Sequence, residues 1–263
     1  NAIPAIRVGR RLGIPVVYYI SPKLWAWRQG RAEFIRQNVR RLISILPFEV
    51  EFYRRFNMEI DYVGNPLVDL VDYPALSRIE PVAGRIGILP GSRKKEIHSL
   101  MPVFAEAARI LLQRLPHLSF VCPRAPNISE EELRALWPAD IPLSFIQPEN
   151  RWAAMRKCEV LLAASGTVTL ESAVAGVPTI ICYKLSPLTY AVGKLLVKVP
   201  FMGLPNLIAG KEIFPELLQD ACSAGSLAAK ALAWLDPQGN DAPLLRVREE
   251  LDAFVAAVHE GFG

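Results

Sequence analysis

Short apolar runs alternate with helical stretches along most of this chain, and this alternation limits its fold more than any other feature. Uninterrupted apolar runs suit strands buried on both faces, which are typical of parallel sheets covered by helices. The clearest helix is predicted at 99–115, where apolar residues recur with the helical period. Strands are predicted at 15–20, 41–47, 61–64, 85–90, 118–122, 143–146, 159–164 and 178–183.

The predicted elements fall into two groups, separated at 72–84 by an irregular stretch that contains proline and glycine. We therefore predict an α/β fold of two Rossmann-like, doubly wound halves. Residues 1–73 form the remainder of a first, incomplete domain, and residues 74–220 form a second domain. Residues 221–263 are predicted to be C-terminal helices from periodicity alone.

The composition excludes several classes of protein. With 51% hydrophobic and 21% charged residues, the chain is globular and not disordered. Its four scattered cysteines argue against a disulfide scaffold or a zinc site and suit a reducing cytoplasm. The apolar stretch 159–183 is interrupted by Gly166, Glu171 and Pro178, so we predict no transmembrane helix.

Positive charge is concentrated at the front of the chain. Residues 1–55 hold eleven Lys and Arg against three acids, whereas the remainder holds nineteen against twenty-three. Such a segment suits phosphate groups or an anionic membrane surface, and a solvated basic helix explains it equally well. It contains no recognised nucleic-acid-binding module, so no nucleic acid partner is expected.

Two loops after predicted strands carry residues suited to a phosphorylated ligand, at the edge where open α/β sheets bind ligands. In the first, Gly91 allows close backbone approach, Ser92 can cap the next helix and Arg93 offers a guanidinium to a phosphate. A Walker lysine pattern is absent, so this is not an ATPase loop. A plain helix cap beside a surface arginine is the alternative.

The second loop reads Ser165-Gly166-Thr167 and follows the apolar run 159–164. Its small residues leave room for a diphosphate, which its hydroxyls and backbone N–H groups can bind. Glu171 lies one turn into the next helix, where a carboxylate can accept hydrogen bonds from ribose hydroxyls. Capping of a core helix explains this loop alone, but two such loops together favour a sugar nucleotide.

At these segments the chain resembles the lipid-A-disaccharide synthases, glycosyltransferases of the two-domain GT-B architecture. The resemblance covers residues 4–220 and rests on the order and spacing of several segments. Lys23 and Asn65 depart from the family pattern, which has Gln and His there. The segments are YYISPKLWAWRQGR (18–31), ILPFEVEFY (45–53), YVGNPLVD (62–69), ILPGSRKKEI (88–97), AASGTVTLESAVAGVPTIICYK (163–184), LPNLIAG (204–210) and FPELLQ (214–219).

The resemblance implies an inverting transfer of 2,3-diacylglucosamine from UDP to 2,3-diacylglucosamine 1-phosphate, which forms the β-1,6 disaccharide of lipid A. It implies that the second half binds UDP, and that Trp25, Trp27 and Arg28 lie on the acceptor and lipid side, although core packing explains the two tryptophans equally well. The residues implied at UDP are Gly91, Ser92, Arg93, Ser165, Gly166, Thr167, Glu171, Tyr183 and Asn206.

The resemblance also implies limits on this chain. No metal or cofactor is expected, because there is no Asp-x-Asp motif and Arg93 with helix N-termini can stabilise the leaving diphosphate. The family's base is expected upstream of Asn1, so no catalytic residue is assigned, and the chain alone is expected to bind UDP weakly without turnover. The implied location is cytoplasmic, peripheral to the inner membrane, with a homodimer as one expected assembly.

Two other functions are compatible with the same fold. One is another UDP-sugar enzyme of GT-B architecture, such as a UDP-N-acetylglucosamine 2-epimerase, and the other is a non-catalytic nucleotide-binding fragment. The segment Trp25–Arg28 favours the synthase, because the rival enzymes lack it.

Overall fold

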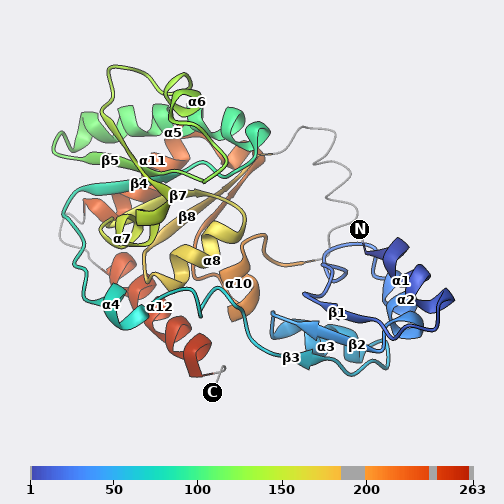
Figure 1. The fold of residues 1–263 in the computed structure, drawn as a ribbon. Helices are drawn as coiled ribbons and strands as arrows, with labels where there is room; N and C mark the ends of the chain where they lie inside the picture. Colours follow the sequence, from blue (N-terminus) through green and yellow to red (C-terminus); the bar gives the residue numbers. More distant parts are fainter. Residues whose placement is uncertain (1, 185–198, 237–241, 261–263) are drawn as a thin grey trace. The chain divides into compact units, whose positions relative to one another are not determined.

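The computed structural model describes residues 2–184, 199–236 and 242–260, and the chain divides into two compact units (Figure 1). The first unit is built mainly from residues 1–69, and the second from residues 70–185 and 201–259. Each unit has its own parallel β-sheet with helices packed on it, which confirms the predicted fold class.

The first unit contains a small parallel sheet in the order β1-β2-β3, and its described residues also form helices α1, α2 and α3. The middle strand is the most buried, and its Leu42 and Ser44 face the interior. The edge strand β1 leaves Val17 and Tyr19 about half exposed. In chain order the elements are α1 (Ile3–Arg11), β1 (Val17–Tyr19), α2 (Arg31–Asn38), β2 (Arg41–Ser44), α3 (Phe48–Arg54) and β3 (Asp61–Tyr62).

A buried carboxylate lies inside this unit. Glu49 of α3 is 1% exposed, and its carboxylate accepts a hydrogen bond from Trp25 Nε1 at 2.8 Å and another from the Ser44 hydroxyl. Burial raises the pKa of Glu49, and the hydrogen bonds from Ser44 and Trp25 and the charge of Lys23 oppose that shift. The family segment 18–31 is thus attached to α3 through a buried polar contact.

The raised pKa of Glu49 gives a stability prediction. The folded chain binds a proton at Glu49 more tightly than the unfolded chain, so this stabilisation is complete below the ordinary value of 4.5 and is lost as pH rises through the folded pKa. Glu49→Gln keeps an acceptor for Trp25 and cannot ionise, so we expect a higher free energy of unfolding at pH 7. Urea unfolding measures this, with the exposed Glu51→Gln as the control; a less stable Glu49→Gln would contradict it.

The second unit contains a six-stranded sheet in the order β6-β5-β4-β7-β8-β9, with every neighbouring pair parallel. Its first five strands lie where they are predicted. Strand β9 is absent from the prediction, because it has three residues, begins with Glu216 and forms no apolar run. The strands are β4 (Arg85–Leu89), β5 (Ser119–Pro123), β6 (Leu143–Ile146), β7 (Val160–Ala164), β8 (Thr179–Tyr183) and β9 (Glu216–Leu218).

Helices cover both faces of this sheet, as Figure 1 shows. The longest, α5, begins five residues earlier than predicted and has α11 packed along it. None of the helices in the described ranges is long and apolar enough to cross a membrane. The helices are α4 (Tyr73–Ser77), α5 (Lys94–Arg114), α6 (Glu130–Arg134), α7 (Arg151–Arg156), α8 (Thr167–Val174), α10 (Leu204–Ala209), α11 (Ala224–Leu235) and α12 (Ala242–Glu260), with short 3-10 turns η1 (Pro148–Asn150) and η2 (Gln219–Ala221).

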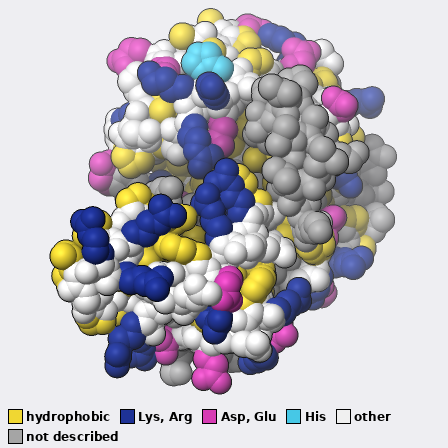
Figure 2. Space-filling view, turned by 90° about the vertical axis from the view of Figure 1, so that its right-hand side faces the viewer, with side chains coloured by type: hydrophobic (Ala, Val, Ile, Leu, Met, Phe, Trp, Pro, Cys, Tyr) yellow, Lys and Arg dark blue, Asp and Glu magenta, His cyan; other side chains and the backbone are white. Residues whose placement is uncertain are grey.

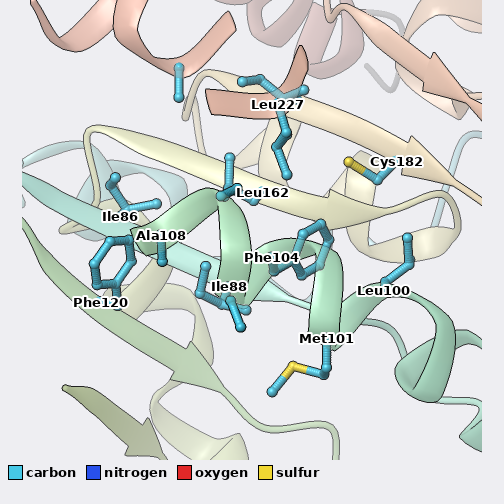
Figure 3. Packing of buried hydrophobic residues seen from close by; sticks show 14 of the residues in the cluster. Ile86, Ile88, Leu100, Met101, Phe104, Ala108, Phe120, Leu162, Cys182 and Leu227 are labelled. Carbon is cyan, nitrogen blue, oxygen red and sulfur yellow. The ribbon is translucent and has the colours of Figure 1, made fainter. Parts of the chain in front are cut away.

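The core of the second unit explains the continuous apolar runs of the sequence. Ile86, Ile88 and Leu162 face α5 and α11, where they pack with Phe104 and Leu227 (Figure 3). The alternate strand residues, such as Leu161 and Ala163, are buried against α7 on the opposite face. Because both faces are covered, a ligand can reach this sheet at the ends of its strands.

Candidate functional site

A cavity of about 320 Å³ lies at the carboxyl ends of β4, β5 and β7 in the second unit. Strands β4 and β7 are neighbours in the sheet, so the loops that follow them meet there. Both loops singled out in the sequence line this cavity. The predicted residues among its walls are Gly91, Ser92, Arg93, Ser165, Gly166, Thr167 and Glu171.

The loop after β4 needs its glycine. Gly91 has φ +97°, a conformation that residues with a side chain rarely adopt. A Cβ built there would lie 3.3 Å from Ala164 Cβ and 3.0 Å from Glu96 Oε2. The same loop is tied to its surroundings by Asn127, whose Nδ2 donates to the Ser92 carbonyl at 2.9 Å. Backbone therefore forms the wall of the cavity at this point.

Neither helix that begins at the cavity has a side-chain cap. Arg93, and not Ser92, is the N-cap residue of α5, and Gly166 is the N-cap residue of α8. Among the residues that the structure describes, no side chain accepts a hydrogen bond from the first turn of either helix. Side-chain capping by Ser92, Ser165 or Thr167, the alternative explanation of these loops, is therefore not seen there, and two positive helix ends face one cavity.

Arg93 lies at the mouth of this cavity. Its side chain is 78% exposed, and its Nη1 donates to Glu96 Oε1 at 2.6 Å. The carboxylate of Glu96 is only 19% exposed, so the exposed partner of this pair is Arg93, whose guanidinium lies in solvent and can reach a phosphate.

Glu171 is the acidic group of the second loop and is nearly buried. Its side chain is 15% exposed, and its Oε2 accepts from Arg151 Nε at 3.2 Å. Burial raises the pKa of Glu171, and the charge and hydrogen bond of Arg151 oppose that shift. Among the described residues no donor reaches Oε1 of Glu171, which leaves this oxygen for a ligand hydroxyl.

The structure adds three charged residues that the sequence analysis missed. Arg124, Arg151 and Glu96 also line the cavity. Arg124 directly follows β5. The other two loops were identified because each follows a predicted strand, and the same criterion would have identified Arg124. Its Nη1 donates to the Ile128 carbonyl and its Nη2 to Gln147 Oε1, both at 2.6 Å. No local sequence signal marks Arg151, which reaches Glu171 across twenty residues.

Two residues predicted to contact UDP lie outside the walls of the cavity. Tyr183 is the last residue of β8 and is half-buried. Burial raises the pKa of its phenol; the nearby charge of Glu96 adds to this shift, and that of Arg93 opposes it.

Asn206 is fully buried in α10. Its Oδ1 accepts from the backbone N–H groups of Ile213 and Phe214 at 2.8 and 2.9 Å. Its Nδ2 donates to the Phe214 carbonyl and to Glu216, both at 2.8 Å, so the amide has no group free for a ligand.

We expect Asn206→Ala to reduce stability rather than ligand affinity. The substitution leaves two buried N–H groups and one carbonyl without their partner, which costs about 3 kcal/mol or more in free energy of unfolding. Urea unfolding with parallel UDP titration of the folded variant tests this. Asn127→Ala, which loses one exposed hydrogen bond, is the stability control. A variant of unchanged stability that no longer binds UDP would restore the predicted ligand role.

The tryptophans of the first unit have different environments. Trp25 is 7% exposed and packs edge-to-face on Phe48 with ring centroids 5.0 Å apart. Of the two explanations given for Trp25, core packing is the one that the structure supports, because its ring is buried and its Nε1 donates to Glu49. Trp27 is 44% exposed, and the guanidinium of Arg28 lies 4.2 Å from its ring centroid.

The described ranges contain no group of three or more His, Cys, Asp or Glu side chains that could hold a metal ion. The site as described consists of glycine, hydroxyl, arginine and carboxylate groups around one cavity.

A family model described as lipid-A-disaccharide synthetase matches residues 5–244. The lipid-A-disaccharide synthase of Geobacter sulfurreducens is 41% identical over 257 residues, which cover 93% of this chain and 67% of that protein. This chain therefore spans about two thirds of the length of that relative.

Solved structures of glycosyltransferases share the fold. MurG of Acinetobacter baumannii has a TM-score of 0.56 at 14% identity, with 98% of this chain and 70% of that chain covered. The spinosyn rhamnosyltransferase SpnG, solved with thymidine diphosphate, has a TM-score of 0.55 at 17% identity, with 98% and 70% covered. At these identities the likeness shows the fold alone, and it agrees with the predicted GT-B architecture.

Proposed function

The chain belongs to the lipid-A-disaccharide synthetase family, and we propose that its second unit binds the UDP of a UDP-linked sugar donor. The family makes it a glycosyltransferase of lipid A formation. One observation carries the assignment of the site: the uncapped starts of α5 and α8 and the carboxylate of Glu171 surround a single cavity.

The proposed binding mode follows from the charges of this cavity. The diphosphate lies against the free N–H groups at the starts of α5 and α8, whose dipoles favour negative charge. Arg93 leaves Glu96 and forms charge-assisted hydrogen bonds to a phosphate oxygen. The ribose hydroxyls donate to Glu171, which Arg151 holds in place.

The proposed reaction is the one that the resemblance implies. The donor is UDP-2,3-diacylglucosamine, and a hydroxyl of 2,3-diacylglucosamine 1-phosphate displaces UDP with inversion. In the transition state charge develops on the leaving diphosphate, where Arg93 and the two helix ends stabilise it. A base must accept the proton of the acceptor hydroxyl, and none of the residues that line the nucleotide cavity is assigned this role.

The location and assembly of the protein are also proposals. The basic front of the chain supports contact with an anionic membrane surface, which suits acylated substrates made at the cytoplasmic side of the inner membrane. A homodimer stays a prediction, which sedimentation equilibrium of the purified chain tests.

Calorimetric titration with UDP tests the proposed site. The 263-residue chain is expected to bind UDP, and Arg93→Ala is expected to weaken binding by about tenfold, since it removes hydrogen bonds to a charged group. Arg114→Ala, at the other end of α5, is the matched control. Equal affinity of Arg93→Ala and the native chain would contradict the assignment of Arg93.

A transfer assay with donor and acceptor tests the expected limit of this chain. UDP binding without disaccharide formation is the expected result, because no base has been assigned to the chain. Disaccharide formed by the purified 263-residue protein would show that the base lies within it.

A further inference from the structure

We propose that Cys182 and Cys222 form a redox-sensitive modification site, a thiol pair of the second unit that hydrogen peroxide converts reversibly to a disulfide. The two residues lie far apart in the sequence, where nothing pairs them. The fold brings them into one buried cluster, and neither lines the nucleotide cavity. The site therefore goes beyond the proposed function and is argued from the second unit alone.

The first thiol belongs to the sheet. Cys182 lies in β8, is fully buried and is one of the core residues labelled in Figure 3. Strand β8 has β7 on one side and β9 on the other. Leu217 is the register partner of Cys182 on β9, and the Cys182 carbonyl accepts from the Ser165 N–H at 2.9 Å. The backbone at Cys182 is thus held from both sides.

The second thiol comes from the segment that connects β9 with α11. Cys222 directly follows the 3-10 turn η2, and its N–H donates to the Gln219 carbonyl at 3.0 Å. The next residue, Ser223, caps α11 and accepts from the Ser226 N–H at 3.2 Å. A turn and a helix cap therefore fix the backbone on either side of Cys222.

The two thiols are hydrogen-bonded to each other. A disulfide forms without strain only where the two sulfur atoms can meet without a large movement of the backbone. Sulfur atoms in hydrogen-bonding contact already lie close together, and the backbone behind each of them is fixed. The pair is therefore placed for a covalent bond.

The two cysteines differ in acidity. The hydrogen bond from the Cys182 thiol lowers the pKa of Cys222; the charge of Lys184 and a backbone hydrogen bond from Tyr183 act in the same direction, and burial opposes them. The same thiol hydrogen bond, together with burial, raises the pKa of Cys182. Cys222 is thus the thiol that ionises first and attacks an oxidant, and Cys182 is the thiol that resolves the product.

An oxidant reaches the pair through a cavity, because the thiols are not on the surface. On the face drawn in Figure 2, the apolar class of side chains, in which cysteine is coloured, lies in patches between charged and polar groups. Cys222 is 1% exposed, yet it lines a cavity of about 440 Å³ together with the polar side chains of Glu106, Lys184 and Asp220. Hydrogen peroxide is scarcely larger than water and suits this route.

The other two cysteines of the chain lack these features. Burial raises the pKa of Cys122 and of Cys158 to about 12. In the described ranges no second thiol is among the groups that act on either of them. Cys158 Sγ donates instead to the Ala154 carbonyl at 3.2 Å. Cys122 and Cys158 therefore serve as internal controls for selective oxidation.

The reaction consumes two thiols and one molecule of hydrogen peroxide. The Cys222 thiolate attacks one peroxide oxygen, the O–O bond breaks, and hydroxide leaves and takes up a proton, so that Cys222 becomes a sulfenic acid. The Cys182 sulfur then attacks the Cys222 sulfur, the S–O bond breaks, and hydroxide leaves as water with the proton of the Cys182 thiol. The two sulfurs together lose two electrons, which the peroxide gains. A small dithiol reverses the reaction by thiol–disulfide exchange and is itself oxidised.

Peroxide treatment of the reduced 263-residue chain tests the site. After treatment the chain is unfolded, its remaining thiols are blocked with iodoacetamide, and its peptides are mapped by mass spectrometry. We expect a loss of about 2 Da, which is the mass of the two thiol hydrogens, and one cross-linked peptide pair that contains Cys182 and Cys222. Cys122 and Cys158 should be recovered as blocked thiols. Dithiothreitol should restore all four thiols.

Three variants test the two roles. Cys182→Ser is expected to stop at the sulfenic acid of Cys222, which dimedone traps. Cys222→Ser is expected to leave Cys182 as a thiol, and Cys158→Ser, the matched control, is expected to form the disulfide like the native chain. If a variant does not fold, the peptide map of the native chain still decides the pairing.

Three results would overturn the proposal. The first is four free thiols in the native chain after treatment with excess peroxide, and the second is a disulfide that joins any other pair of cysteines. The third is an equal yield of the Cys182–Cys222 bridge when the chain is oxidised in urea. Cys158 is nearer to Cys182 in the sequence than Cys222 is and closes a shorter loop, so selective pairing with Cys222 requires the fold.

Discussion

Glu171→Ala is expected to weaken UDP binding by about tenfold to a hundredfold, because hydrogen bonds to a charged group contribute about 1.5–3 kcal/mol. Its side chain is 15% exposed, so water replaces a lost ribose contact poorly. The substitution also removes the carboxylate that pairs with Arg151. The Arg151 side chain is 31% exposed and would then lie unpaired beside the bound nucleotide. Both effects act on the nucleoside end of the cavity.

Calorimetry at constant pH measures this effect, and two variants sharpen it. Glu171→Gln keeps an acceptor and the shape of the side chain, so its loss of affinity should be smaller than that of Glu171→Ala. Glu149→Ala removes an exposed carboxylate from η1 with the same change in net charge and should leave affinity unaltered. If Glu171→Ala bound UDP like the native chain, Glu171 would be a structural partner of Arg151 only.

Gly91→Val is expected to damage both the fold and the site of the second unit. Valine is β-branched and rarely adopts φ near +97°, and its Cβ would approach Ala164 Cβ at 3.3 Å. Ala164 ends β7 and is buried, so it cannot move aside freely. Strain and overpacking together should lower the free energy of unfolding by about 2–4 kcal/mol.

The same variant should lose UDP affinity even where it is folded, because the loop that it distorts forms a wall of the cavity. Urea unfolding followed by UDP titration of the folded fraction measures the two effects. Gly225→Val is the control, since a Cβ at Gly225 in α11 meets no atom within 4 Å. Native stability of Gly91→Val would show that this loop is not constrained as described.

The sheets and the two phosphate loops could be predicted because their signals are local. The strands β4 and β7 are mostly apolar runs, and each of the two loops follows one of these runs with glycine and hydroxyl residues. Strand β9 has no such signal: its pairing with β8 depends on the sheet already being present.

Side-chain roles that depend on contacts with residues distant in the sequence could not be predicted. Trp25 and Trp27 are two residues apart and alike in chemistry, and contacts with Phe48 and Glu49, far along the chain, hold Trp25 in the core. Asn206 belongs to a family segment, yet its amide holds the backbone of Ile213 and Phe214. A shared motif does not distinguish a residue that binds a ligand from one that supports the loop beside it.

The most direct test of the nucleotide site is to follow backbone amide resonances of the ¹⁵N-labelled chain while UDP is added. The amides of Gly91, Gly166 and Thr167 and of the first turns of α5 and α8 should shift with one shared dissociation constant. Arg93→Ala should reduce these shifts at equal UDP concentration. Saturable shifts confined to other residues, or none at all in a folded chain, would contradict the assignment of this cavity to UDP.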